Sequence, residues 1–200
     1  MKIIAPFLCI LLFAFIVPAF AGGSPTEDLK PALNSLVDTL GDESLKGDEK
    51  KEERRTKIMD EIKKGFDFRE MSRRVLGKTW RKIDAAEQEN FTNIMTKLLE
   101  NVYVGKLETY TGGDIAYVNE AIKGKRAQVT TLIEDNGVKL PVHYIMRQGG
   151  DRWQVYDINI EGVSLVRNYQ EQFKSILRKD KYDGLVKVLN EKNKAFAEGK

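Results

Sequence analysis

Residues 112–160 read GGDIAYVNEAIKGKRAQVTTLIEDNGVKLPVHYIMRQGGDRWQVYDINI, and this stretch decides the fold class. Hydrophobic and polar residues alternate along it in short runs, as they do in β-strands that bury one face. Turn residues separate the runs at 123–125, 135–137 and 149–151, and connections this short join antiparallel neighbours. We therefore predict an antiparallel sheet of about four to five strands. The alternating positions are Ile115 and Tyr117; Val129, Thr131 and Ile133; Leu140, Val142, Tyr144 and Met146; and Trp153, Val155 and Asp157.

Helical periodicity replaces this alternation on both sides of the sheet. Before it, the longest apolar stripe spans 84–104, and Asp84 with Glu87 has the spacing of a helix cap at its start. A shorter helix is expected between a cap at Asp67 and the stop at Gly77. Two more helical stretches follow the sheet. The order helices, sheet, helices predicts a single α+β domain over 22–200, in which a curved antiparallel sheet has helices packed on one face.

The first helix and the segment after it are less regular. Ser24 and Pro25 supply a cap and a first helical residue, and an apolar stripe then runs to Gly41. Pro31 interrupts this stripe and fits only if the helix begins a few residues later than the cap suggests. Charged side chains dominate residues 42–64, most densely over 42–55, and we expect a solvated linker there that runs into a charged helix.

The first 21 residues differ in composition from the rest of the chain. Eighteen of them are hydrophobic, against just over a third of the remaining residues. A positive Lys2, an apolar run over 3–17 and small residues up to Ala21 are typical of a secretory signal peptide, with cleavage after Ala21. The alternative is an uncleaved membrane anchor, but the run is short for a spanning helix, which needs about 20 apolar residues.

Export would have chemical consequences for the mature chain. Cleavage removes Lys2 and the lone Cys9, so the net charge falls from +3 to +2 and no cysteine is left. Disulfides, thiol chemistry and a cysteine-bound zinc are then excluded. The weak positive balance, with both signs interspersed, gives no indication of a nucleic-acid partner.

No residue pattern indicates catalysis or metal binding. His143 is the only histidine, and it is out of phase with the apolar positions of its strand, so we expect it to point away from the buried face. Asp157 and Glu161 flank the corner where the sheet gives way to a helix, and we interpret them as a cap and a hydrogen-bonding group. The alternative is a small hydrolase or isomerase that uses them together with Tyr156. We assign no catalytic residue, no metal ligand and no cofactor.

Large apolar residues concentrate on helical and strand positions that are expected to face one another. Such an interface is either a filled core or a cavity lined by the same residues, and periodicity does not distinguish the two. If it is a cavity, our candidate lining residues are Trp80, Phe91, Met95, Leu98, Leu99, Tyr103, Leu107, Tyr110, Val129, Val142, Tyr144, Met146 and Trp153.

Two segments are more specific than simple periodicity. They are FDFREMSRRVLGKTW over 66–80 and WQVYDINIEGVSLVRNYQEQF over 153–173. Together with the expected signal peptide and the order of elements, they resemble the MlaC/toluene-tolerance family, which comprises periplasmic binding components of phospholipid ABC transport systems. The resemblance covers essentially the whole mature chain, and the second segment is its most specific part.

The resemblance implies a monomeric periplasmic carrier that holds phospholipid tails between its sheet and its helices and so helps to maintain outer-membrane lipid asymmetry. It also implies docking at an outer-membrane lipoprotein complex and at an inner-membrane ABC transporter complex. Pro31 and the charged segment 42–55 depart from the family's pattern. An exported interaction domain with a closed core is the alternative, and the presence or absence of a cavity distinguishes the two.

Overall fold

The computed structural model describes residues 23–108, 115–135 and 138–198. The expected signal peptide over 1–21 and the candidate residue Tyr110 lie outside these ranges. Within them, the regular structure consists of six α-helices, one five-stranded sheet and three short 3-10 turns. No helix of these ranges is both long enough and apolar enough to cross a membrane. The predicted α+β class is confirmed.

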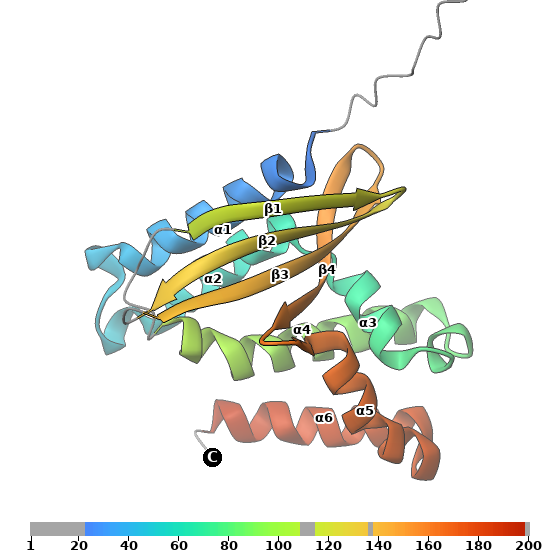
Figure 1. Ribbon diagram of the computed structural model, residues 1–200. Coiled ribbons are helices and arrows are strands. Elements are labelled where there is room, and N and C mark those ends of the chain that lie inside the picture. Colours follow the sequence, from blue (N-terminus) through green and yellow to red (C-terminus); the bar gives the residue numbers. More distant parts are fainter. Residues whose placement is uncertain (1–22, 109–114, 136–137, 199–200) are drawn as a thin grey trace, which may run out of the picture.

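The sheet is a meander in which each strand pairs antiparallel with its neighbours in the sequence. β3 lies at its centre, and β1 and the short β5 form its edges (Figure 1). The register places Val129 opposite Tyr144, and Tyr144 opposite Ile158, so apolar positions of neighbouring strands share one face. The strands are β1 (Ile115–Lys123), β2 (Arg126–Asp135), β3 (Val138–Gly149), β4 (Arg152–Ile160) and β5 (Val163–Ser164).

The helices gather on one side of the sheet and beyond its lower edge. In Figure 1, α1 and α2 lie behind the sheet, α4 runs along its lower edge behind the end of β4, and α5 and α6 lie below, with α6 packed against α4. The helices are α1 (Pro25–Gly41), α2 (Lys51–Gly65), α3 (Phe68–Leu76), α4 (Ala85–Leu107), α5 (Leu165–Lys179) and α6 (Lys181–Ala197).

α1 begins earlier than its internal proline led us to expect. It starts at Pro25, where the Ser24 hydroxyl accepts a hydrogen bond from the Glu27 amide (3.2 Å), and it continues through Pro31. An interior proline removes one helix hydrogen bond and costs about 3 kcal/mol. Pro31 lies on the exposed side of α1, where water can satisfy the carbonyl left without a partner, while burial of the opposite side stabilises the helix. The prediction of a later start was wrong.

The predicted caps of α3 and α4 are confirmed. The Asp67 carboxylate accepts a hydrogen bond from the Glu70 amide (2.8 Å), and α3 ends before Gly77, whose φ of 56° lies in the left-handed region that favours glycine. Asp84 and Glu87 form a reciprocal capping box at the start of α4. The local sequence therefore determines where both helices begin.

The charged segment 42–55 is folded onto the protein. It forms 3-10 turns at Glu43–Leu45 and Asp48–Lys50 and then enters α2, which is the charged helix that was predicted. Leu45 is buried, and the Arg54 guanidinium donates hydrogen bonds to the Leu45 carbonyl (2.5 Å) and to the Glu108 carboxylate (2.9 Å). Most of the segment before α2 is exposed, as the predicted solvated linker requires, but these contacts also tie the start of α2 to the end of α4.

A β-bulge in β4 changes which residues face the helices. Val155 and Asp157 pair with successive residues of β3, so Tyr156 between them is an extra residue. The alternation predicted through Asp157 is therefore wrong. Beyond the bulge, Ile158 and Ile160 take the apolar face, and Asp157 takes the other face.

Tightly packed side chains fill the space between α3, the first half of α4, α5 and α6. Phe91, Leu98 and Leu185 have no exposed surface there. A second packed group joins α1 to the sheet and includes Leu29 and Val129, which are also fully buried. A third, smaller packed group joins α1, α2 and α4 and consists of Leu36, Ile58, Met59 and Val104. The interior that all three groups border is not filled.

Candidate functional site

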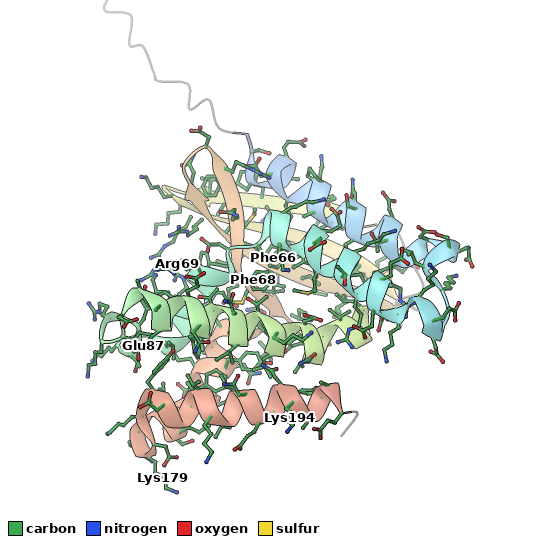
Figure 2. All side chains as sticks on the ribbon, turned by 180° about the vertical axis from the view of Figure 1, so that it is seen from behind. Phe66, Phe68, Arg69, Glu87, Lys179 and Lys194 are labelled. Carbon is green, nitrogen blue, oxygen red and sulfur yellow. The ribbon has the colours of Figure 1, made fainter. Side chains whose placement is uncertain are left out.

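An apolar cavity of about 530 Å³ lies between the sheet, α1, α2 and the second half of α4. Figure 2 shows Phe66 and Phe68, two of its lining residues, near the centre of the molecule. Among the described residues, the lining consists of Ala32, Leu33, Leu36, Val37 and Leu40 of α1; Met59 and Ile62 of α2; Phe66, Phe68 and Met71 in and before α3; Leu99, Glu100, Tyr103, Val104 and Leu107 of α4; Ile115, Ile133, Leu140, Val142, Tyr144, Ile158, Ile160 and Val163 of the sheet; and Leu165 and Asn168 of α5.

Polar contacts at both ends hold the covering helices in place. At the start of α1, the Asp28 carboxylate accepts a hydrogen bond from the Trp153 amide (2.7 Å), which fastens this helix to β4. At the other end, Arg54 and Glu108 form an ion pair (2.8 Å) in which both side chains are largely buried. The later turns of α1 and the body of α2 thus span the cavity between two fixed points.

The cavity lining reaches the protein surface where β4 passes into β5. Ile160 and Val163 both line the cavity, yet 38% and 59% of their surface is exposed. Glu100 and Asn168 are the polar, non-aromatic side chains of the lining, and Glu100 pairs with Lys97 (2.7 Å). An apolar ligand can therefore enter here, with polar groups available at the wall.

Tyr103 connects the cavity wall with the packed region around α5. Burial raises the pKa of the Tyr169 phenol, and the neighbouring Tyr103, with which it shares a hydrogen bond, raises the pKa further. A tyrosine is already neutral at physiological pH, and both effects move the Tyr169 phenol further from ionisation, so it acts as a hydrogen-bonding contact between α4 and α5.

Titratable groups suited to catalysis do not gather among the described residues of the cavity lining. The Asp157 carboxylate accepts hydrogen bonds from the Ser164 hydroxyl (2.6 Å) and the Val166 amide (3.0 Å), so it caps the start of α5. His143 lies on the outer face of the sheet, as predicted, with its Nδ1 atom 3.0 Å from the Thr130 hydroxyl. Within 23–108, 115–135 and 138–198, no group of His, Cys, Asp or Glu side chains could hold a metal ion. The arrangement suits binding of an apolar ligand.

Tyr110 lies outside the described ranges, and the structure divides the other twelve candidate residues among three places. Leu99, Tyr103, Leu107, Val142 and Tyr144 line the cavity. The others described lie in packed regions: Trp80, Phe91, Met95 and Leu98 among the helices, and Val129, Met146 and Trp153 between the sheet and α1.

Sequence reasoning missed lining residues for two reasons. Ile133 and Leu140 belong to the alternating pattern of their strands, so a signal for them was present. Leu36, Met59 and Ile62 come from α1 and α2, and their periodicity shows only that each helix has an apolar side. Which element that side meets is a tertiary property.

Comparisons with known proteins agree with this geometry. A protein-family model described as "MlaC protein" matches residues 30–191. The chain is 25% identical over 187 residues to the intermembrane phospholipid transport system binding protein MlaC of Haemophilus influenzae, covering 90% of this chain and 87% of that protein. It is also similar to the solved structure of a phospholipid-binding protein from Ralstonia solanacearum in complex with a phospholipid. That match has a TM-score of 0.79 at 25% identity and covers 88% of this chain and 99% of the other.

Proposed function

This chain belongs to the MlaC family, and from that premise we propose that it binds a phospholipid by its acyl chains in the cavity and carries it between membranes. The observation that carries the proposal is an apolar cavity of about 530 Å³ whose lining continues to the surface. Its volume lies in the range of roughly 300–1,000 Å³ that is typical of small-molecule sites. The phospholipid complex of the similar Ralstonia solanacearum protein supports the same ligand class.

The energetics of lipid transfer require an enclosing site. Two acyl chains with roughly 28 methylenes cost about 20 kcal/mol to expose to water, at about 0.8 kcal/mol for each methylene. A cavity of this size is also unfavourable when empty, because its lining lacks packing partners. Bound lipid therefore stabilises the carrier, and the carrier shields the lipid from water.

The cavity argues against the closed-core alternative, since the interior that this alternative requires is not filled. The geometry of Asp157 gives the enzyme alternative no support either, because both of its carboxylate oxygens accept hydrogen bonds at the start of α5. We therefore assign no catalytic residues.

The cellular setting that we propose is the periplasm, reached by a signal peptide over 1–21. The Haemophilus influenzae relative is named as the binding protein of an intermembrane phospholipid transport system. By extension, this chain would act as a monomer that collects lipid at one membrane complex and delivers it at another, with an outer-membrane lipoprotein complex and an inner-membrane ABC transporter as the two docking partners.

Organic extraction and mass spectrometry of the purified protein test the ligand, and a pair of valine variants tests the site. Val142 is a buried lining residue on β3, whereas Val188 on α6 is exposed and lies outside the cavity. Val142→Trp should lower the lipid-to-protein ratio at least several-fold because the indole occupies the space of the acyl chains. Val188→Trp should leave that ratio unchanged. A wild-type protein that carries no lipid and binds no labelled phospholipid would overturn the proposal, as would a folded Val142→Trp protein with unchanged lipid content.

A further inference from the structure

A second concave region, separate from the lipid cavity, lies around the end of α3. It is a pocket of about 410 Å³ that shares no lining residue with the apolar cavity. Four of its six lining residues are cationic, and the other two are Gly77 and the largely buried Trp80. We call it the cationic pocket, and its basic lining residues are Arg73, Arg74, Lys78 and Arg81.

The positive charge of the chain is concentrated around this pocket. Residues 68–82 contain six basic side chains and one acidic side chain, a net charge of +5. The whole chain has a net charge of +3, so the other residues together contribute −2. The cationic pocket is therefore a local positive field on a nearly neutral protein, which is the arrangement that attracts an acidic partner.

Buried and aromatic contacts hold two of the arginines in fixed orientations. The Glu70 carboxylate, 4% exposed, accepts hydrogen bonds from Arg73 (2.6 Å, through both Nε and Nη2) and from Arg74 (2.8 Å). The Arg74 guanidinium also lies 3.8 Å from the centroid of the Tyr156 ring. Guanidinium groups that are already ordered lose little conformational freedom when they bind a carboxylate.

Other cations of this region retain unused binding capacity. Lys78, Arg81 and Lys82 are exposed, and none of them forms an ion pair with a carboxylate in the described part of the chain. Arg73 is half exposed despite its pairing with Glu70. These side chains can donate charge-assisted hydrogen bonds to an incoming anionic group.

We propose that the cationic pocket is a docking site for an acidic segment of a partner protein, whose Asp and Glu side chains enter between Arg73, Lys78 and Arg81. The cations are spread around a wide pocket, which suits several carboxylates on one segment better than a single small anion.

A membrane surface fits the cationic pocket less well than an acidic segment does. The pocket is concave, and the large exposed apolar residues of the described chain, such as Val118, Ile122 and Val163, belong to other elements, so no apolar side chain is available here to insert into a bilayer.

A charge-reversal pair with a matched control tests this proposal. Lys78→Glu/Arg81→Glu removes two cations without touching the Glu70 contacts, and Lys187→Glu/Lys192→Glu makes the same change in net charge at exposed positions of α6. In Figure 2, Lys179 and Lys194 mark the two ends of the stretch that contains this control pair. Arg69, also labelled there, lies on α3, and its guanidinium is 5.2 Å from the centroid of the ring of Trp80, which lines the cationic pocket. The probe is a fluorescently labelled peptide that carries six glutamates, and its binding is followed by anisotropy over a range of salt concentrations.

The proposal expects at least a tenfold loss of peptide affinity in Lys78→Glu/Arg81→Glu and less than a twofold loss in the α6 variant. Affinity of the wild type should fall steeply with salt. Equal losses in both variants would overturn the proposal, because binding would then reflect net charge alone. It would also be overturned if phosphatidylglycerol vesicles bind in a Lys78-dependent way while the peptide does not, or if millimolar inorganic phosphate displaces the peptide completely. Lipid content measured by mass spectrometry should be the same in all three proteins, so failure here is distinguishable from failure of the carrier proposal.

Discussion

The two halves of α4 face two different interiors. In the first half, Phe91, Met95 and Leu98 pack among α3, α5 and α6, and these three side chains are almost completely buried. The second half, with Tyr103 and Leu107, lines a cavity of about 530 Å³. A single apolar stripe runs through both halves, so the side-chain chemistry is the same. The difference lies in what faces the stripe. Side chains of α3, α5 and α6 fill the space beside the first half, whereas the sheet, α1 and α2 enclose an unfilled space beside the second half.

This contrast separates stability from binding within one molecule. Apolar side chains in the closed core have partners on all sides, and each contributes its full burial energy to folding. Apolar side chains in the cavity wall lack partners on one side and contribute fully only when a ligand fills the space. Substitutions of the same chemical kind should therefore have different consequences in the two places.

The largest difference is expected from a pair of leucine truncations on α4. Leu98→Ala in the closed core should lower the free energy of unfolding by about 3 kcal/mol, because it leaves a new cavity among packed neighbours. Leu107→Ala in the cavity wall should cost less than about 1 kcal/mol, because it enlarges a space that already exists. Urea denaturation of both lipid-free proteins measures the two values. Equal losses of unfolding free energy in the two variants would mean that the two interiors are packed alike, which would contradict the distinction between core and cavity.

The next largest difference in stability is expected between two glutamates, one beside the closed core and one beside the cavity. Glu70, at the closed end, is buried and contacts three arginines, whereas Glu108, at the cavity end, contacts one. Glu70→Gln should cost about 2 kcal/mol, since hydrogen bonds to charged groups contribute about 1.5–3 kcal/mol. Glu108→Gln should cost less, about 1 kcal/mol, because Arg54 keeps its hydrogen bonds to the Leu45 and Gly47 carbonyls. Urea unfolding at pH 7 compares the two variants.

The pH dependence of the Glu70 effect has a definite sign. Burial raises the pKa of Glu70, but the hydrogen bond from Arg73 and the charges of Arg74, Arg73 and Arg147 outweigh burial and lower the pKa below its ordinary value. A lowered pKa in the folded state stabilises the protein above the unfolded pKa of about 4.3, and that contribution is lost as the pH falls through the folded pKa. The difference in stability between wild type and Glu70→Gln should therefore shrink below about pH 4. A difference that stays constant from pH 7 to pH 3 would show that the carboxylate charge is not what stabilises α3.

The sequence predicted the local features of both interiors but not the boundary between them. Caps at Asp67 and Asp84 and the alternation in β3 are properties of neighbouring residues, and they were read correctly. The bulge at Tyr156 has no local signal, because the extra residue is defined by pairing with β3. The change along α4 from core to cavity was equally invisible, since it depends on where α1 and α2 lie. Periodicity identifies an apolar side, and only the tertiary arrangement decides whether that side meets protein or empty space.

The smallest effect is expected where α1 and α2 meet beside the cavity. Gly65 ends α2, and a Cβ placed on it would lie 2.8 Å from the Ala32 Cβ, so Gly65→Ala must push the two helices apart. We expect a net cost of about 1 kcal/mol, because overpacking outweighs the gain of about 0.5–1 kcal/mol that alanine normally brings to a helix.

Gly105→Ala on α4 is the matched control for Gly65→Ala. Its Cβ meets nothing within 4 Å, so this substitution should be neutral or stabilising. Adding Ala32→Gly to Gly65→Ala removes the close contact, and urea unfolding of the single and double variants should show a coupling of about 1 kcal/mol. If Gly65→Ala is as harmless as Gly105→Ala, then α1 and α2 can separate at no cost even without lipid, and the contact between them does not fix the width of the cavity.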